Sequence, residues 1–177
     1  QPTLAPTEPP SHYGARIDSD TAGPFPESLQ GFTQAINFVD HFSRLFSVYF
    51  LRGLKAPNIS DAARAFVRDH RHLLLLIAQP GAVDTWYSDN GTEFTNEDVE
   101  QFAVDMGTRR SFSVPEVPQT NGAAERCWGT LLRSMRAMLA HAGGDSVQAA
   151  FWPFLMLAAV QRHNLLYTYA STPPSIP

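Results

Sequence analysis

The stretch VDTWYSDNGTEF, residues 83–94, decides the architecture expected for this chain. Its first six residues favour β-structure and predict a strand that delivers Asp89 at its tip. The Asn-Gly pair that follows favours a turn, so Asp89 taken alone is explained as well by the turn as by a functional site. Glu125 follows after an interval of 35 residues (125 − 89 = 36). That interval has room for one helix, one strand and a loop, which would bring a helical glutamate back beside the strand end.

Five runs of β-forming residues predict strands. In the first, Ile17 alternates with polar neighbours and the run ends at Asp20, before Gly23 and Pro24 break it. The second and third runs are separated only by the segment DHFSR, which suits an antiparallel pair. The predicted strands span residues 15–20, 35–39, 45–51, 83–88 and 109–113.

Apolar residues recur at helical spacing in four further segments. We expect Asn58 or Ser60 to cap the first helix and Thr95 to open a capping box for the second. Pro153 would be tolerated early in the last helix or would kink it, and residues 114–121 would form a loop. The predicted helices span residues 59 to about 80, 95–107, the segment that carries Glu125, and about 147–167; the buried stripe of the third comprises Ala124, Trp128, Leu131, Met135 and Met138.

The length of 177 residues and the hydrophobic content of 44% suit a single domain with one proper core. Residues 1–13 contain four prolines and few large apolar side chains, so we expect a disordered linker there and a folded core over residues 14–177. The longest apolar run, residues 149–160, is too short to span a bilayer, and no signal peptide is recognisable. We therefore expect an intracellular protein with no membrane partner.

The net charge of −4, from 13 basic and 17 acidic residues, argues against strong DNA binding by this chain alone. Affinity for a polyanion rises with the number of phosphates that Lys and Arg neutralise. Cys127 is the only cysteine, which excludes an internal disulfide and a zinc cluster built from cysteines. The six histidines show no ligand spacing, since His70 and His72 would point to different faces of a helix.

Three carboxylates in unlike settings carry the functional prediction: Asp20 at the end of the first strand, Asp89, and Glu125 on its helix. Ionised carboxylates held close together raise one another's pKa unless divalent cations neutralise them. Oxygen ligands of this kind suit Mg²⁺ or Mn²⁺ rather than zinc. A glutamate in the first turn of a helix is also stabilised by the helix macrodipole, so Glu125 alone does not decide between a ligand and a structural residue.

Five sequence blocks stand in a set order along the chain: IDSDTAGP at 17–24, FVDHFSR at 38–44, YSDNGTEF at 87–94, PQTNGAAERCW at 118–128 and FWPFLMLAAVQRHN at 151–164. Together they resemble the integrase catalytic core of retroviruses and LTR retrotransposons, most closely the copia type. The resemblance runs from about Arg16 to Pro174. It implies an α/β protein with an RNase H-like fold, in which helices flank a mixed five-stranded sheet.

By this resemblance the chain is a DDE-type DNA integrase, a polynucleotidyl transferase with nuclease and DNA-joining activity. Asp20 would bridge two Mg²⁺ or Mn²⁺ ions, Asp89 would bind one and Glu125 the other, for 3′-end processing and strand transfer of retrotransposon DNA. The family places its first aspartate three positions before a Gly-Pro pair, which selects Asp20 rather than Asp18. Glu93 would be a neighbour of the site rather than a ligand.

The resemblance also implies partners: the DNA ends of the element, target DNA, and further copies of the chain in a homodimer or higher oligomer, with no small-molecule cofactor. The expected location is the nucleus or a virus-like particle. The apolar last helix, with Phe151, Phe154 and Leu155, has a face to spare for dimerisation. The loop at 114–121 would form a mobile gate beside the metals. The candidate DNA contacts are Gln119, Asn121, Arg126, Arg133 and Arg136, although the arginines also suit a solvated helix face.

Some positions depart from the family pattern. Gly129 and Leu132 stand where retroviral relatives often carry basic side chains, and Trp128 stands where copia-type relatives commonly carry Asn. A nuclease of RNA–DNA hybrids is disfavoured by the order Asp, Asp, Glu. A degenerate or domesticated core that acts as a non-catalytic DNA-tethering or oligomerisation module is opposed by the intact carboxylates but supported by the acidic charge. Whichever function holds, we expect Asp18 to be a solvated or supporting carboxylate and Asp40 to be a turn residue at the end of its strand.

Overall fold

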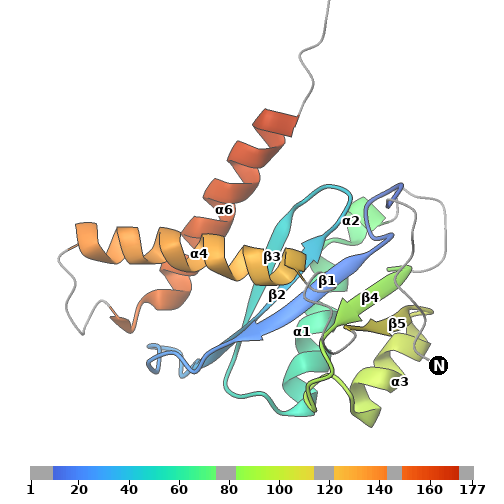
Figure 1. Ribbon diagram of the computed structural model, residues 1–177. Helices are drawn as coiled ribbons and strands as arrows, with labels where there is room; N and C mark the ends of the chain where they lie inside the picture. The colour runs from blue at the N-terminus through green and yellow to red at the C-terminus, as the bar shows by residue number, and fades with distance from the viewer. Residues whose placement is uncertain (1–9, 75–82, 114–121, 143–148, 172–177) are drawn as a thin grey trace, which may run out of the picture.

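The computed structural model describes residues 10–74, 83–113, 122–142 and 149–171. Its centre is one five-stranded mixed sheet with the strand order β3-β2-β1-β4-β5 (Figure 1). The first three strands pair antiparallel, whereas β4 runs parallel to β1 and β5 parallel to β4. The expected mixed sheet is thereby confirmed. The strands are β1 (Ile17–Ala22), β2 (Gln34–Asp40), β3 (Phe46–Leu51), β4 (Thr85–Ser88) and β5 (Arg109–Phe112).

Helices cover both faces of the sheet, and each face has its own apolar core (Figure 1). Because side chains alternate along a strand, Ile36 and Phe38 of β2 pack in one core while Ala35 and Val39 pack in the other. α1 and α3 lie on the first side, and α4 and α6 on the second, where the far end of α6 projects away from the sheet. The helices are α1 (Ala56–Asp69), α2 (Arg71–Leu74), α3 (Glu97–Asp105), α4 (Gly122–His141) and α6 (Trp152–Ser171).

The single helix predicted from residue 59 to about 80 is wrong, because α1 ends at Asp69 and the short α2 follows. His70 separates them by satisfying groups at the end of α1: its backbone N–H donates to the Phe66 carbonyl at 3.0 Å, and its ring Nδ1 lies 2.9 Å from the same oxygen. The ring Nε2 lies 3.0 Å from the Ser47 hydroxyl on β3. A tertiary contact of this kind is not visible in a periodic pattern.

Two predicted helix caps are also wrong. α1 begins at Ala56 with Lys55 as its N-cap, which makes no side-chain capping bond, so neither Asn58 nor Ser60 caps it. Pro57 lies in the first turn, where its missing N–H is not needed. The N-cap of α3 is Asn96 rather than Thr95; its side-chain oxygen accepts from the Val99 N–H at 3.0 Å.

Two segments differ from expectation, one near the N-terminus and one at the start of the last helix. Tyr13 was assigned to the linker, yet it is only 8% exposed and packs in the core beside α1. The division into a linker and a core otherwise stays a prediction, since residues 1–9 lie outside the described ranges. The last helix, predicted from about residue 147, is α6 and begins at Trp152. Pro153 therefore occupies its first turn, where proline is tolerated. None of the helices in the described ranges is long and apolar enough to cross a bilayer.

Candidate active site

Three separate elements supply the three predicted carboxylates. Asp20 lies on β1, Asp89 directly follows β4, and Glu125 lies in the first turn of α4. β1 and β4 are neighbouring parallel strands, paired at Asp18 and Tyr87, so their carboxyl ends meet at the same edge of the sheet. This is the edge where functional groups gather in α/β folds with parallel strands. α4 packs on β1 and β2 and brings Glu125 to the same edge.

The pKa of Asp20 responds to burial and to the carboxylates around it. Partial burial is the main cause that raises its pKa, which reaches about 6 instead of the ordinary 3.8. The charges of Asp89, Glu125 and Glu93 raise the pKa further, while a hydrogen bond from the Thr21 N–H opposes the shift. The structure therefore places Asp89, Glu125 and a fourth carboxylate, Glu93, within electrostatic reach of Asp20.

The turn after β4 is closed by a hydrogen bond to the side chain of Asp89. The Gly91 N–H donates to Asp89 Oδ1 at 3.0 Å, which fixes that carboxylate against its own loop. A Cβ atom at Gly91 would lie 2.5 Å from Glu93 Oε2, the end of a flexible side chain, so a larger residue there would displace the Glu93 carboxylate. Glu93 in turn accepts a 3.4 Å hydrogen bond from the Thr21 hydroxyl on β1. The Asn-Gly turn and the functional explanation of Asp89 are thus compatible, because the turn itself orients the carboxylate.

The position of α4 depends on a residue that the sequence reasoning missed. Asn37 is fully buried in β2; its side-chain oxygen accepts from the Asp20 N–H at 2.9 Å, and its side-chain nitrogen donates to the Ala124 carbonyl at 2.9 Å. It therefore touches the residue before Glu125 and the backbone of Asp20 at once. The available signal was a single amide within the otherwise apolar run 35–39.

The residues fit divalent cations in chemistry and charge. All their donor atoms are carboxylate oxygens, the ligands that Mg²⁺ and Mn²⁺ prefer, and a cation would relieve the repulsion that adds to burial in raising the pKa of Asp20. In the described residues no three His, Cys, Asp or Glu side chains stand close enough together to hold an ion as they are oriented here. The charge interaction with Asp20 and the lack of a ready ligand group are compatible, because they concern interactions over different distances. Charges interact over about 8 Å at physiological salt, whereas Mg²⁺ needs oxygens at about 2 Å.

Two other aspartates have structural surroundings. Asp18, expected to be solvated or supporting, is fully buried and bound by Arg16 (Nε to Oδ1, 2.7 Å) and His41 (Nε2 to Oδ2, 2.6 Å). Asp40, expected as a turn residue, is also buried and accepts from the backbone N–H groups of Gly14 and Ser43. The solvated alternative for Asp18 is therefore wrong, and the turn role of Asp40 is supported by its bond to Ser43.

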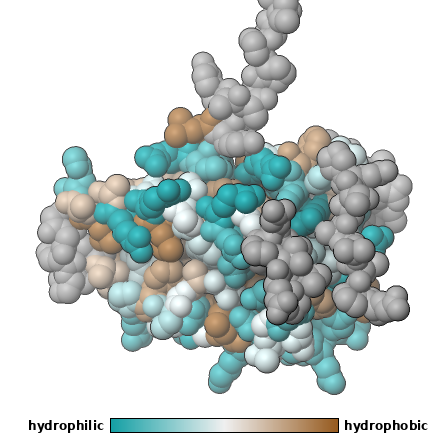
Figure 2. Space-filling view, viewed as in Figure 1, coloured by the Kyte–Doolittle hydropathy of each residue, from teal (hydrophilic) through white to brown (hydrophobic). Residues whose placement is uncertain are grey.

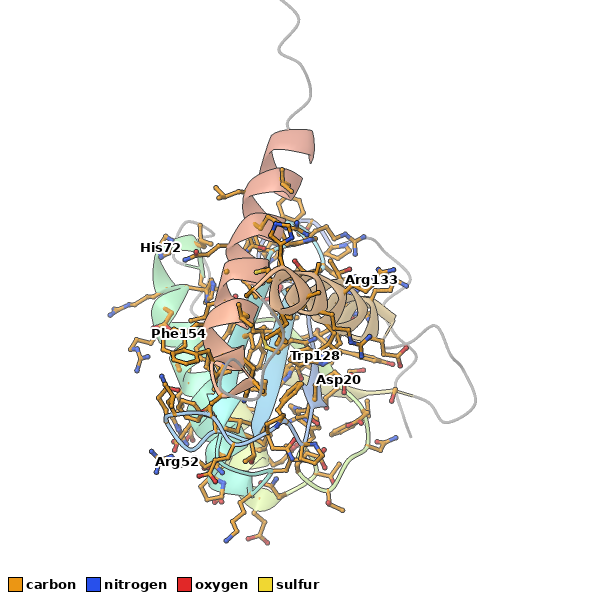
Figure 3. The ribbon with its side chains drawn as sticks, turned by 90° about the vertical axis from the view of Figure 1, so that its left-hand side faces the viewer. Asp20, Arg52, His72, Trp128, Arg133 and Phe154 are labelled. Carbon is orange, nitrogen blue, oxygen red and sulfur yellow. The ribbon has the colours of Figure 1, made fainter. Side chains whose placement is uncertain are left out.

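The five predicted DNA contacts fall in two segments of the chain, and only one of these segments is among the described residues. Arg126, Arg133 and Arg136 are exposed on α4, and Figure 3 shows Arg133 directed away from the sheet. Hydrophilic side chains gather over this helix in Figure 2. Gln119 and Asn121 fall, with the predicted gate loop at 114–121, outside the described residues.

The positions that depart from the family pattern have different environments. Trp128 is buried in the core under α4, whereas Gly129 is exposed and a Cβ atom there would meet nothing within 4 Å. Phe151, just before α6, and Phe154 on α6 are exposed, and Figure 3 shows Phe154 on the outside of the helix, but Leu155 is partly buried in the core. Leu155 therefore contributes less to a free apolar face than expected.

Sequence comparisons find relatives among retroelement polyproteins. The chain is 31% identical over 141 residues to the retrovirus-related Pol polyprotein from transposon TNT 1-94 of Nicotiana tabacum, and 30% identical over 131 residues to that from transposon RE1 of Arabidopsis thaliana. The matches cover 76% and 74% of this chain but only 10% and 8% of the relatives, so the chain spans about a tenth of their length. No family model matches the sequence.

Solved structures show the same fold. A chain of the simian T-cell lymphotropic virus intasome, solved in complex with PP2A regulatory subunit B56 gamma, matches 93% of this chain and 56% of its own length with a TM-score of 0.64 and 16% identity. The catalytic core domain of BIV integrase matches 90% of this chain and 99% of its own length with a TM-score of 0.57 and 15% identity. These neighbours confirm the expected RNase H-like fold of integrase catalytic cores.

Proposed function

We propose that this chain, a homologue of retrotransposon and retroviral Pol polyproteins with the fold of an integrase catalytic core, is a metal-dependent polynucleotidyl transferase that processes DNA 3′ ends and joins them to target DNA. The single observation that carries this proposal is the placement of Asp20, Asp89 and Glu125 on β1, after the neighbouring β4 and on α4, which packs on β1. A family relationship alone would not require the carboxylates to meet.

Asp20, Asp89 and Glu125 would hold two Mg²⁺ or Mn²⁺ ions. When bound, such ions activate an oxygen nucleophile and neutralise charge on the reacting phosphate. The chain's own residues supply the framework: the Gly91 N–H fixes the Asp89 carboxylate, and burial keeps water partly away from Asp20. Because the nucleophile would be water and then a DNA 3′-hydroxyl, no side chain needs to form a covalent intermediate.

DNA would approach across α4. Arg126, Arg133 and Arg136 are exposed there and suit contacts to phosphates, which position DNA without reading its sequence. Gln119 and Asn121 are proposed as further contacts from the adjoining loop. The net charge of −4 predicts weak, salt-sensitive binding by this chain alone. We propose element ends and target DNA as substrates, a homodimer or higher oligomer as the working form, and the nucleus or a virus-like particle as its location.

A strand-transfer assay tests the proposal. With Mn²⁺ and a DNA duplex as both donor and target, the chain should nick and join DNA, and Asp89→Asn should lower the rate by about 100-fold or more, since metal stabilisation of a transition state contributes several kcal/mol. Asp98→Asn is the matched control, because it makes the same chemical change at an exposed residue in the first turn of α3. Equal rates for the wild type and Asp89→Asn would refute the assignment.

One alternative has specific support. A non-catalytic module for DNA tethering or oligomerisation would account for the acidic charge and for the exposed apolar side chains of Phe151, Phe154 and Leu157 at and near the start of α6. It predicts a dimer at micromolar concentration by sedimentation and no joining activity with Mn²⁺. Joining activity that depends on Asp89 would exclude it.

A further inference from the structure

Asn37 is a polar side chain in a strand that is otherwise apolar at this point. It is fully buried, and its neighbours Ile36 and Phe38 are buried in the opposite core. A buried amide is costly unless its donors and acceptor are bonded. Its oxygen accepts from Asp20 N–H and its nitrogen donates to the Ala124 carbonyl, both at 2.9 Å. The amide orientation follows, since an N–H needs an acceptor and a carbonyl needs a donor.

These bonds connect two elements that are distant in the sequence. Asn37 lies directly opposite Asp20 in the β1–β2 pairing, and Ala124 lies in the first turn of α4. The parallel pairing of β1 with β4 covers Ile17 and Asp18, so the amide of Asn37 satisfies the Asp20 N–H beyond that pairing. The link sets where the first turn of α4 stands relative to β1.

The packing around this link leaves α4 little freedom at its start. The first three residues of α4, Gly122 to Ala124, are small and buried, so the helix backbone comes close to the sheet. The thiol of Cys127, one turn further, is also buried and lies within hydrogen-bonding reach of the Asn37 amide. One side chain of β2 therefore contacts α4 on both sides of Glu125 in the sequence.

We propose that Asn37 is a positioning residue that holds Asp20 and Glu125 at the separation needed to share divalent cations. This inference rests on the proposed function. Metal ligands must be held to within about 0.5 Å, and groups that orient them typically change metal affinity 10- to 100-fold when removed. Without the amide, the first turn of α4 loses its bond to the sheet next to Glu125.

The chain provides a matched control in Asn164 on α6. Its side-chain oxygen accepts from the Phe46 N–H at 2.9 Å, and its nitrogen donates to the Phe46 carbonyl at 2.8 Å. Asn164 therefore also joins a helix to the sheet, with one accepted and one donated hydrogen bond to the backbone, as Asn37 does. Phe46 lies on β3, which is two strands away from β1 in the sheet. Loss of either asparagine removes two backbone bonds, but only one loss affects the proposed ligands.

The test measures Mn²⁺ binding to the full chain by titration calorimetry at pH 7.5, with urea unfolding in EDTA as the measure of stability. Asn37→Leu should weaken Mn²⁺ binding by about tenfold or more, and Asn37→Ser, whose hydroxyl keeps part of the bonding, by less. Asn164→Leu should lower stability and leave Mn²⁺ affinity unchanged. If Asn37→Leu does not fold, Asn37→Ser compared with Asn164→Leu carries the same test.

The outcomes separate the two proposals. Wild-type affinity in both Asn37 variants would overturn the positioning role and leave the proposed function intact. An equal loss of affinity in Asn164→Leu would also overturn it, since the effect would then follow general destabilisation. A wild-type chain that binds no Mn²⁺ would overturn both proposals together. A selective loss in the Asn37 variants, with a higher Mn²⁺ requirement for DNA nicking, would support the role.

Discussion

Asp18 and Asp20 lie two residues apart on β1 and face the same side of the sheet, yet their charges are treated in opposite ways. Asp18 is fully buried, and Arg16 and His41 bind both of its oxygens. Asp20 is partly exposed, and the charged groups that raise its pKa are all carboxylates. The fold neutralises the first aspartate itself and leaves the second with unbalanced negative charge.

This contrast indicates where the chain stabilises itself and where it keeps the capacity to bind. A buried charge with cationic partners contributes to a stable fold only as long as the partners remain. A partly buried carboxylate among other carboxylates raises the energy of the folded state, and such strain is common at functional sites. The same strand thus serves structure at Asp18 and the proposed chemistry at Asp20.

The largest effect is expected from breaking the neutralised site. Asp18→Ala would leave the guanidinium of Arg16, which is only 14% exposed, without its counter-charge and the ring of His41 without its hydrogen-bond partner. We expect a loss of about 3–5 kcal/mol in the free energy of unfolding, measured in urea at pH 7. The control Asp98→Ala, on the exposed first turn of α3, should lose no more than about 1 kcal/mol. A loss for Asp18→Ala as small as that of the control would show that the ion pairs contribute little.

A smaller effect of opposite sign is expected at Asp20. Its pKa is about 6 in the folded protein against an ordinary 3.8, so the folded state binds this proton more tightly than the unfolded chain does. The stability that Asp20 contributes is therefore present below about pH 4 and is lost as the pH rises through 6. Asn cannot ionise, so Asp20→Asn should be more stable than the wild type by about 1–2 kcal/mol at pH 7.5, allowing for partial exposure.

The measurement is urea unfolding of both proteins at pH 3.5 and 7.5 in EDTA, then at pH 7.5 with Mn²⁺. The two proteins should be equally stable at pH 3.5. Mn²⁺ at ten times its dissociation constant should stabilise the wild type by about 1.4 kcal/mol and Asp20→Asn by clearly less. A variant that is less stable than the wild type at pH 7.5 would contradict the charge repulsion around Asp20.

The sheet could be predicted from the sequence because its signal is local. Alternation in Ile17–Ala22 and the apolar runs of β2 and β3 define strands without knowledge of their partners. The placement of Asp20 on β1, Asp89 after β4 and Glu125 on α4 was predictable in outline, since the interval between the last two allows only a short return path and the family resemblance supplied the first. That prediction concerned which residues approach one another rather than the orientation of their side chains.

The remainder depends on contacts between distant segments. Alternation places Asp18 and Asp20 on one face, but it does not show that His41, after β2, will reach only Asp18. His70, where the helix breaks, contacts Ser47 on another element, and the bonds of Asn37 reach α4, which follows much later in the chain. Periodicity identifies a buried face, whereas the partners across that face are set by tertiary packing.

The smallest effect should come from Glu93, which sharpens the distinction between a ligand and a neighbour. Among the carboxylates that raise the pKa of Asp20, Glu93 has the weakest influence, and it accepts a hydrogen bond from the Thr21 hydroxyl on β1. Glu93→Gln keeps an oxygen for that bond and removes the charge. We expect the pKa of Asp20 to fall slightly from about 6, with a gain in stability of about 0.5 kcal/mol or less at pH 7.5.

An NMR titration of the Asp20 carboxyl carbon measures this change directly. The control Glu97→Gln removes the same charge from the exposed first turn of α3 and should leave the titration of Asp20 where it is in the wild type. Mn²⁺ affinity should stay within about threefold of the wild type, because Glu93 is proposed as a neighbour rather than a ligand. A loss of affinity as large as that of Asp20→Asn would make Glu93 a fourth metal ligand, and the charge contrast along β1 would then extend across the turn after β4.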